Sequence, residues 1–151
     1  MKKLVVIGFL IFWSNSFSQN SSESLKKDLE IQIEIDSTVY EIKQGNSYYT
    51  KDEKSAIQAK LIPMSFEKMK QNMLKKTSDN VDEGSIIING VNILFVKKIS
   101  EDKANMILIY CKENDENSSI SFVSFYPSKS ENYYKQIIEK AFLSAKIKQQ
   151  I

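Results

Sequence analysis

Residues 86–111 read IIINGVNILFVKKISEDKANMILIYC, and this stretch decides the fold. Asn89-Gly90 accepts the positive φ angles of a type I′ turn, so the apolar runs on either side of it predict a hairpin of two antiparallel strands. Polar residues 101–105 predict a second turn, which leads into a strand at Met106–Cys111. Both faces of that strand are apolar, so both must be covered by other parts of the protein.

The chain beyond this stretch continues the same pattern. A loop at Glu113–Ser119 is predicted to lead to a strand at Ile120–Tyr126, which Pro127 ends. The connections between these strands are too short for parallel crossovers, so the sheet is predicted to be mostly antiparallel. Ser130 is placed to cap a helix over Glu131–Ala145. The apolar face of this helix consists of Tyr134, Ile137, Ile138, Ala141, Phe142 and Ala145.

The N-terminal half begins with two predicted strands. Leu29–Ile35 alternates apolar and polar residues, which indicates a strand with one face in water. Asp36-Ser37 is predicted to turn the chain into a second strand at Thr38–Ile42. Gly45-Asn46 then breaks the chain again.

A third strand and a helix follow, and they complete the predicted fold. Residues 55–61 predict the strand, which Pro63 ends, with Ile57, Ala59 and Leu61 on one face. Ser65 is placed to cap a helix from Phe66 to about Lys76. The elements together predict one α+β domain over residues 29–151. Its mostly antiparallel sheet has about six strands with helices on both faces, an α-β-α sandwich.

The first eighteen residues have the layout of a secretory signal peptide. Lys2 and Lys3 precede an apolar run at Leu4–Trp13, and Ser14–Ser18 supplies small residues before a predicted cut after Ser18. The apolar run is too short to cross a hydrocarbon core of about 30 Å. Polar residues 19–28 predict a flexible leader. We therefore expect an exported protein, periplasmic or extracellular, without a membrane anchor after cleavage.

Composition excludes several kinds of chemistry. All 21 basic residues are lysines, and the chain has no arginine and no histidine. Ser-His-Asp and Cys-His catalysis and histidine-based zinc sites are therefore excluded. Removal of Lys2 and Lys3 leaves 19 basic against 19 acidic residues, so no positive field favours nucleic acid. Cys111 is the only cysteine, and its apolar strand predicts a buried, inert thiol.

Two pairs of tyrosines are candidates for binding. Tyr133-Tyr134 opens the last helix, where adjacent side chains point about 100° apart, so Tyr133 is predicted at the margin of the apolar face. Tyr48-Tyr49 lies between Gly45-Asn46 and the charged run Lys51–Lys54. Tyrosine is enriched in protein interfaces. The favoured interpretation of each pair is one ring in the core and one lying over the sheet edge, because scattered exposed aromatic rings are ordinary. Tyr48, Tyr49 and Tyr133 are the candidate binding residues.

The acidic run Glu113-Asn114-Asp115-Glu116-Asn117 offers the oxygen ligands that Ca²⁺ prefers. Its spacing does not fit an EF-hand loop, and it lacks the glycine that such a loop needs. A solvated loop is the favoured interpretation. No metal and no cofactor is predicted, and Glu113, Asp115 and Glu116 are only weak candidates for a cation site. No carboxylate pair or Ser–Lys pair is marked as catalytic, so we expect a protein that is not an enzyme.

The order of elements resembles the PsbP/Mog1-like fold. The resemblance spans residues 29–148 and rests on Leu61-Ile62-Pro63, the strand exit Ser124-Phe125-Tyr126-Pro127, and a final helix that starts with Tyr133–Ile138 and ends near Ser144-Ala145-Lys146. Members of that family are mostly non-catalytic and dock on a larger complex or on a GTPase. The resemblance therefore implies an accessory binding module. None of the family's functional residues is matched here.

These observations predict an exported, non-enzymatic domain that binds another envelope or extracellular protein. Within the binding class, an immunity or inhibitor protein is an alternative. From another class, the alternative is a small-ligand or Ca²⁺ carrier, with a pocket between sheet and helix or a site at Glu113–Asn117. The sequence itself specifies neither the partner nor an oligomeric state.

Overall fold

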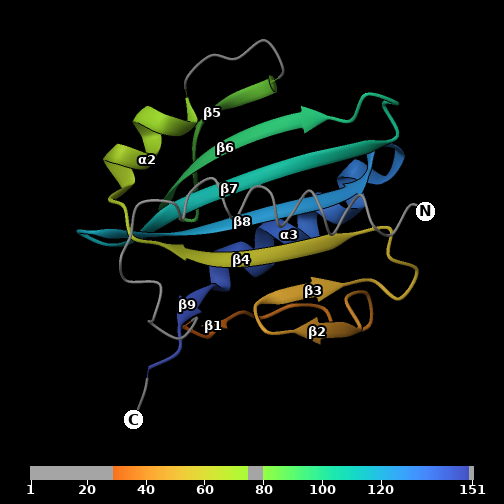
Figure 1. The fold of residues 1–151 in the computed structure, drawn as a ribbon, viewed down its shortest axis with the longest axis horizontal. Helices are drawn as coiled ribbons and strands as arrows, with labels where there is room; N and C mark the ends of the chain where they lie inside the picture. The colour runs from red at the N-terminus through yellow and green to blue at the C-terminus, as the bar shows by residue number, and fades with distance from the viewer. Residues whose placement is uncertain (1–28, 75–79, 150–151) are drawn as a thin grey trace.

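The computed structural model describes residues 29–74 and 80–149, which form a mixed α+β structure around a seven-stranded antiparallel sheet of order β2-β3-β4-β8-β7-β6-β5 (Figure 1). The predicted signal peptide (1–18) and leader (19–28) lie outside the described residues. The sheet consists of β2 (Ile42–Gln44), β3 (Ser47–Tyr49), β4 (Ala56–Ile62), β5 (Asn80–Ile88), β6 (Val91–Ile99), β7 (Asn105–Asp115) and β8 (Ser118–Pro127). The helices are α2 (Phe66–Met73) and α3 (Glu131–Ser144), the latter preceded by the 3₁₀ turn η1 (Ser128–Ser130). A separate small sheet pairs β1 (Ile31–Gln32) with β9 (Lys146–Ile147).

The central hairpins confirm the prediction of a mostly antiparallel sheet. Asn89 and Gly90 have φ angles of 50° and 79°, and they join β5 to β6 with Ile88 opposite Val91. The predicted loop at Glu113–Ser119 is wrong, because β7 runs to Asp115 and β8 starts at Ser118. The Asp115 carboxylate accepts the backbone N–H of Asn117 at 2.8 Å, which turns the chain in two residues and lets both strands continue.

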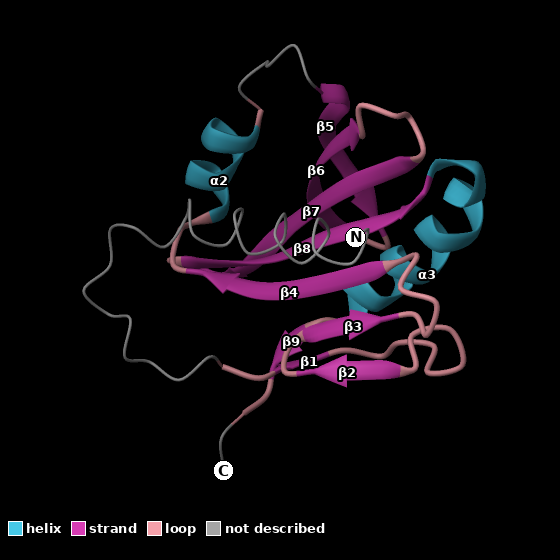
Figure 2. Ribbon diagram, turned by 45° about the vertical axis from the view of Figure 1, so that its right-hand side comes forward, coloured by secondary structure: helices cyan, strands magenta, loops and turns pink. Residues whose placement is uncertain are grey.

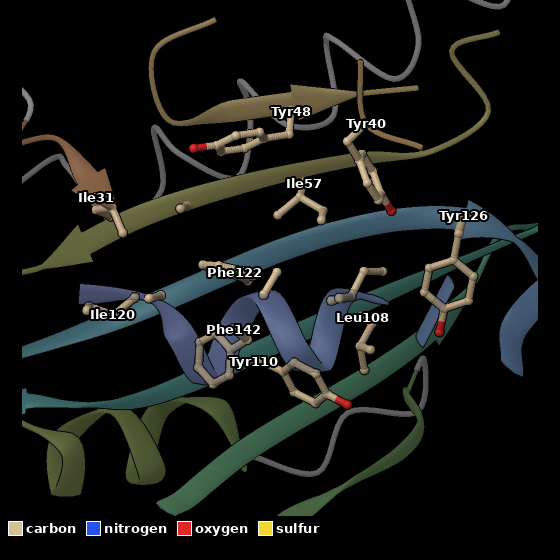
Figure 3. Close-up of a cluster of buried hydrophobic side chains, with 14 of the residues drawn as sticks. Ile31, Tyr40, Tyr48, Ile57, Leu108, Tyr110, Ile120, Phe122, Tyr126 and Phe142 are labelled. Carbon is tan, nitrogen blue, oxygen red and sulfur yellow. The ribbon is translucent and has the colours of Figure 1, made fainter. Parts of the chain in front are cut away.

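The buried residues of the central strands alternate between two clusters. One cluster contains Ile93, Leu108, Tyr110 and Phe122 together with Ile138, Ala141 and Phe142 of α3 (Figure 3). The other contains Leu94, Val96, Ile109 and Cys111 together with Met69 and Met73 of α2. Neighbouring residues of a strand point to opposite faces, so the two clusters lie on the two sides of the sheet. In Figure 2 the sheet runs between α2 and α3.

The two helices begin differently. Ser65 caps α2 as predicted, because its side chain accepts the N–H of Lys68 and its carbonyl accepts the N–H of Met69. Ser130 makes no side-chain cap, which corrects the prediction for α3. The reason is that η1 runs directly into the helix, so Ser130 lacks the extended backbone that a capping serine adopts. No helix in residues 29–74 and 80–149 is long and apolar enough to cross a membrane.

The N-terminal strands differ most from the prediction. Within Leu29–Ile35 only Ile31-Gln32 is paired, and its partner is β9 rather than a strand of the large sheet. The predicted strand Thr38–Ile42 is wrong, because residues 37–39 form a turn and the strand is β2. The Asp36 carboxylate accepts the backbone N–H of Thr38 at 3.0 Å, and this local bond replaces strand pairing.

Asn46, in the turn between β2 and β3, holds the N-terminal segment in place. Its side-chain oxygen accepts the N–H of Ile31, and its side-chain amide donates to the carbonyl of Leu29, both at 2.9 Å. Ile31 is fully buried in the core cluster that includes the apolar face of α3.

Replacing Asn46 with Ala removes both hydrogen bonds and leaves two backbone groups of the N-terminal segment without partners. We expect the unfolding free energy to fall by about 1–3 kcal/mol. We also expect faster amide exchange at Ile31, measured by hydrogen exchange with mass spectrometry. Asn132→Ala, at an exposed position on α3, is the matched control and should change neither quantity. Unchanged exchange at Ile31 in the Asn46 variant would contradict this account.

Candidate binding groove

A shallow groove of about 380 Å³ lies where three segments meet: the turn after β1, the loop after β3 and the first turn of α3. It is lined by Thr38, Val39, Glu41, Thr50, Lys51, Asp52, Tyr133 and Tyr134. Tyr133 and the residues that follow Tyr48-Tyr49 are far apart in sequence, and the structure brings them to the same place.

The aromatic wall is held by ring contacts. Tyr134 stacks on Tyr126 with ring centroids 6.2 Å apart, and burial raises the pKa of the Tyr134 hydroxyl. Tyr133 meets Tyr134 edge to face at 5.1 Å and is 55% exposed. The ring of Tyr133 is therefore exposed, and its position is stabilised by contact with the partly buried ring of Tyr134.

The opposite wall of the groove is the loop after β3, whose conformation is stabilised by hydrogen bonds within the loop. The Thr50 hydroxyl donates to the Asp52 carboxylate at 2.8 Å, and Asp52 also accepts the N–H of Lys54. The hydrogen bond from Thr50 is the main reason that the pKa of Asp52 is lowered. Glu53 adopts a φ of 58°, and its N–H donates to the carbonyl of Thr50. The loop is therefore preorganised, with the carboxylate of Asp52 ionised at neutral pH.

Tyr40 lies beneath the groove and anchors the turn after β1. It is buried, and its hydroxyl lies 2.7 Å from the Ser55 hydroxyl (Tyr40 is labelled in Figure 3). Ser55 donates to the carbonyl of Phe125, so Tyr40 must be the donor in its bond with Ser55. Burial raises the pKa of Tyr40 far above its ordinary value. This chain of bonds ties the turn to β4 and β8.

The groove has the chemistry of a recognition surface. It combines one exposed ring, two threonine hydroxyls and charges of both signs at Glu41, Lys51 and Asp52. Asp52 is engaged by its own loop, and no histidine exists to act as a base. The arrangement can bind a segment with an apolar or aromatic side chain next to polar groups.

The structure places the other predicted binding residues away from this groove. Tyr48 is 5% exposed and belongs to the core cluster with α3, so its ring does not reach the surface, and we correct that assignment. Tyr49 is partly buried and packs against the cluster with α2. Their positions follow from strand alternation, which sends adjacent side chains to opposite faces. The binding role of Tyr133 stays a prediction.

The acidic run Glu113–Asn117 forms the end of β7 and the turn that leads to β8. Glu113 pairs with Ser119 in the strand ladder, and Asp115 accepts bonds from its own turn. These backbone and side-chain bonds lower the pKa of Asp115. Among residues 29–74 and 80–149, no group of three acidic, cysteine or histidine side chains, including Glu113, Asp115 and Glu116, is placed to hold a metal ion.

Lys112 is a buried polar residue that the sequence analysis did not single out. It is 7% exposed, and its ammonium donates to the carbonyls of Phe142 and Leu143 at 2.8 and 3.1 Å. These carbonyls belong to the last turn of α3, where the Phe142 carbonyl also accepts the N–H of Ala145 at 3.1 Å. Burial lowers the pKa of Lys112 to about 8. The signal in the sequence was its spacing, since it follows Leu108 and Tyr110 on the same face of β7.

The groove residues from the turn after β1 were also missed. The sequence predicts Thr38, Val39 and Glu41 in a strand, where their side chains would alternate between faces, whereas in the structure all three line the groove. The sequence Asp36-Ser37-Thr38 carried the opposite signal, because an aspartate two residues before a threonine favours a side-chain-closed turn.

Comparison with known proteins gives a likeness of fold. No protein-family model and no curated protein matches this chain. Among solved structures, it is similar to the solution structure of cyanobacterial PsbP (CyanoP) from Synechocystis sp. PCC 6803. That match has a TM-score of 0.48 and 5% identity, and it covers 86% of this chain and 99% of the other. No residue role is transferred from it.

Proposed function

We propose that this protein is an exported, non-enzymatic accessory domain that binds another envelope or extracellular protein through the groove at Tyr133. The observation that carries the proposal is the exposed Tyr133 ring, supported by Tyr134 and facing the preorganised loop at Thr50–Ser55. A rigid aromatic ring beside fixed polar groups loses little entropy on binding, which favours a protein contact.

The absence of histidine supports a binding role over a catalytic one. The groove contains no histidine, and the carboxylate of its aspartate accepts hydrogen bonds from the Thr50 hydroxyl and the Lys54 N–H. The signal-like first eighteen residues support export.

Capture of the partner tests the proposal. The protein, recovered after export, is immobilised and exposed to native envelope extract at low and moderate salt, and bound proteins are identified by mass spectrometry. Tyr133→Ala is expected to reduce recovery of the main partner about tenfold or more, which corresponds to a contact of about 1–2 kcal/mol. Its melting temperature should stay within about one degree, because the ring is mostly outside the core.

Val81→Ala is the matched control, because Val81 is 57% exposed on β5 and Tyr133 is 55% exposed. It should capture the partner as the unchanged protein does. Equal recovery with Tyr133→Ala and Val81→Ala would refute the groove as the binding site. A captured toxin or hydrolase whose activity is blocked would identify an immunity or inhibitor protein within the same binding class.

A small ligand is the second candidate occupant of this groove. The volume of about 380 Å³ falls in the range of small-molecule sites, which is about 300–1,000 Å³. The discriminating result is a melting temperature that rises with a small molecule from envelope extract in the unchanged protein and does not rise in Tyr133→Ala.

A further inference from the structure

The two edges of the large sheet differ in how open they are to another strand. Edge strand β2 has only three residues, and it carries Lys43. Short strands and lysines are the usual means by which proteins block edge pairing. Edge strand β5 has nine residues and no lysine, and it ends in Ile86-Ile87-Ile88 (Figure 1). Among residues 29–74 and 80–149 no strand pairs with the outer side of β5, so the β5 edge is the open one.

The hairpin fixes which backbone groups of β5 face outward. Ile88 and Val91 close the two-residue turn, so they form a hydrogen-bonded pair. Such pairs alternate with non-bonded ones along an antiparallel ladder. The N–H and C=O groups of Glu83, Ser85 and Ile87 consequently point away from β6. The N–H of Glu83 donates to the Asp82 carboxylate at 2.9 Å, so the groups that the edge offers are both groups of Ser85 and Ile87 and the carbonyl of Glu83.

The side chains of the same strand are arranged asymmetrically. Its N-terminal part carries the carboxylates Asp82 and Glu83, and its C-terminal part carries only isoleucines. Ile87 is 75% exposed, the most exposed of the large apolar side chains in residues 29–74 and 80–149. An added strand that carried carboxylates opposite this acidic end would be repelled, so a second β5 is accommodated when its acidic end lies away from the first.

We propose that the occupant of this edge is β5 of a second copy of this chain, antiparallel, with the two-fold axis at Ser85. In this register Ser85 lies opposite Ser85 of the second copy. Glu83 of each copy lies opposite Ile87 of the other, so this pair occurs twice. The Ser85 pair supplies two backbone hydrogen bonds, and each Glu83–Ile87 pair supplies one from the Ile87 N–H to the Glu83 carbonyl, about four in total. The two Glu83 carboxylates then lie about 13 Å apart along the strand, whereas a parallel in-register pairing would set them side by side.

Gly84 fits the same register. It lies opposite Ile86 of the second copy and has no side chain, and the Phe95 ring comes within 3.2 Å of where a Cβ would stand. The ring covers this gap in the edge, so the second copy's Ile86 meets an aromatic surface. The result is one continuous antiparallel sheet across two copies.

Sedimentation velocity over a range of concentrations tests the proposal, using the protein recovered after export. The unchanged protein is expected to pass from monomer to dimer as its concentration rises. Ser85→Pro removes the central N–H donor of the contact and keeps the backbone hydrogen bonds to β6, although it also removes the side-chain bond from the Ser85 hydroxyl to Asn92. It should remain monomeric with its circular dichroism unchanged. Dimerisation of Ser85→Pro as strong as that of the unchanged protein would overturn the proposal, as would a monomer at every concentration.

The register is tested by the sign of the charge at position 87. Ile87→Glu places a carboxylate opposite Glu83 of the second copy twice, and the dimer dissociation constant should rise about tenfold. Ile87→Lys places an ammonium there and should leave that constant unchanged or lower it. Ile42→Glu on the opposite edge is the control and should have no effect. Equal weakening by Ile87→Glu and Ile87→Lys would refute the register at Ser85.

Discussion

Replacing Phe142 with Ala is expected to lower the free energy of unfolding by about 3–5 kcal/mol. Phe142 is fully buried at the centre of the contact between α3 and the sheet (Figure 3). Its ring lies 4.9 Å from that of Phe122, edge to face, and 5.3 Å from that of Tyr110. The variant loses the burial of the ring and both aromatic contacts, and it leaves a cavity that two strands of a rigid sheet cannot close.

Urea denaturation followed by circular dichroism measures this loss. Phe142→Leu retains most of the volume and should lose clearly less. Tyr133→Ala removes an aromatic ring from the same helix at an exposed position and should change the unfolding free energy by no more than about 0.5 kcal/mol. A loss below about 1 kcal/mol for Phe142→Ala would mean that α3 does not dock on the sheet as described.

The second large effect is a rise in stability with pH that comes from Lys112. Burial lowers its pKa from 10.5 to about 8 in the folded protein. Between these values the unfolded chain holds a proton that the folded chain has released, so the unfolding free energy rises with pH. The slope approaches about 1.4 kcal/mol per pH unit, and the whole difference is on the order of 3 kcal/mol.

The adjacent residue opposes this rise. Burial raises the pKa of the Cys111 thiol from 9.0 to about 12. Above pH 9 the unfolded chain loses this proton while the folded chain keeps it, so the unfolding free energy falls with pH. The unchanged protein should therefore gain stability from pH 8 to 9 and then level off. Above pH 10 it should lose stability, because burial also raises the pKa values of Tyr40, Tyr110 and Tyr126.

Urea denaturation at intervals from pH 7 to 10 separates the two groups. Cys111→Ala should show the rise from Lys112 continuing to about pH 9.5, above which the buried tyrosines oppose it. Lys112→Met should show no rise at pH 8 and a fall that starts near pH 9. The comparison uses slopes within each variant, so the packing changes of either substitution do not affect it. A slope in Cys111→Ala that equals the slope in Lys112→Met would contradict the assignment.

The central part of the fold could be predicted from the sequence because local signals and burial agree there. Asn89-Gly90 specifies a turn by its backbone, and the apolar runs on either side have no alternative to being buried strands. The face of α3 at Ile138, Ala141 and Phe142 follows from the spacing of apolar residues and is buried as predicted.

The N-terminal part could not be predicted because its strand partners are distant in sequence. The alternation of apolar and polar residues in Leu29–Ile35 indicates that one face of the segment is buried. It does not identify the strand that forms backbone hydrogen bonds with the segment. The partner of Ile31-Gln32 is Lys146-Ile147, more than a hundred residues away, and Asn46 completes the attachment. At Asp36–Thr38 a side-chain hydrogen bond outweighed the strand propensity of Thr38 and Val39.

The candidate site divides in the same way. Helical geometry alone placed Tyr133 at the margin of the apolar face, and it is exposed. For Tyr48-Tyr49 the alternation of a strand required opposite faces, and only the packing of the sheet decided that Tyr48 points into the core. That Thr50 and Asp52 face Tyr133 required the docking of α3 and could not be read from either segment.

The sequence by itself determined the strands, turns and helix faces whose signals are local, together with the chemistry that a chain without histidine and arginine lacks. The tertiary structure alone decided the strand order, the burial of Tyr48, the cap that Lys112 places on α3, the groove beside Tyr133 and the open edge at β5. The physical reason is that periodicity and turn propensity act over a few residues. Hydrogen bonds between strands and the burial of side chains join segments that the chain separates by dozens of residues, and only packing selects among them.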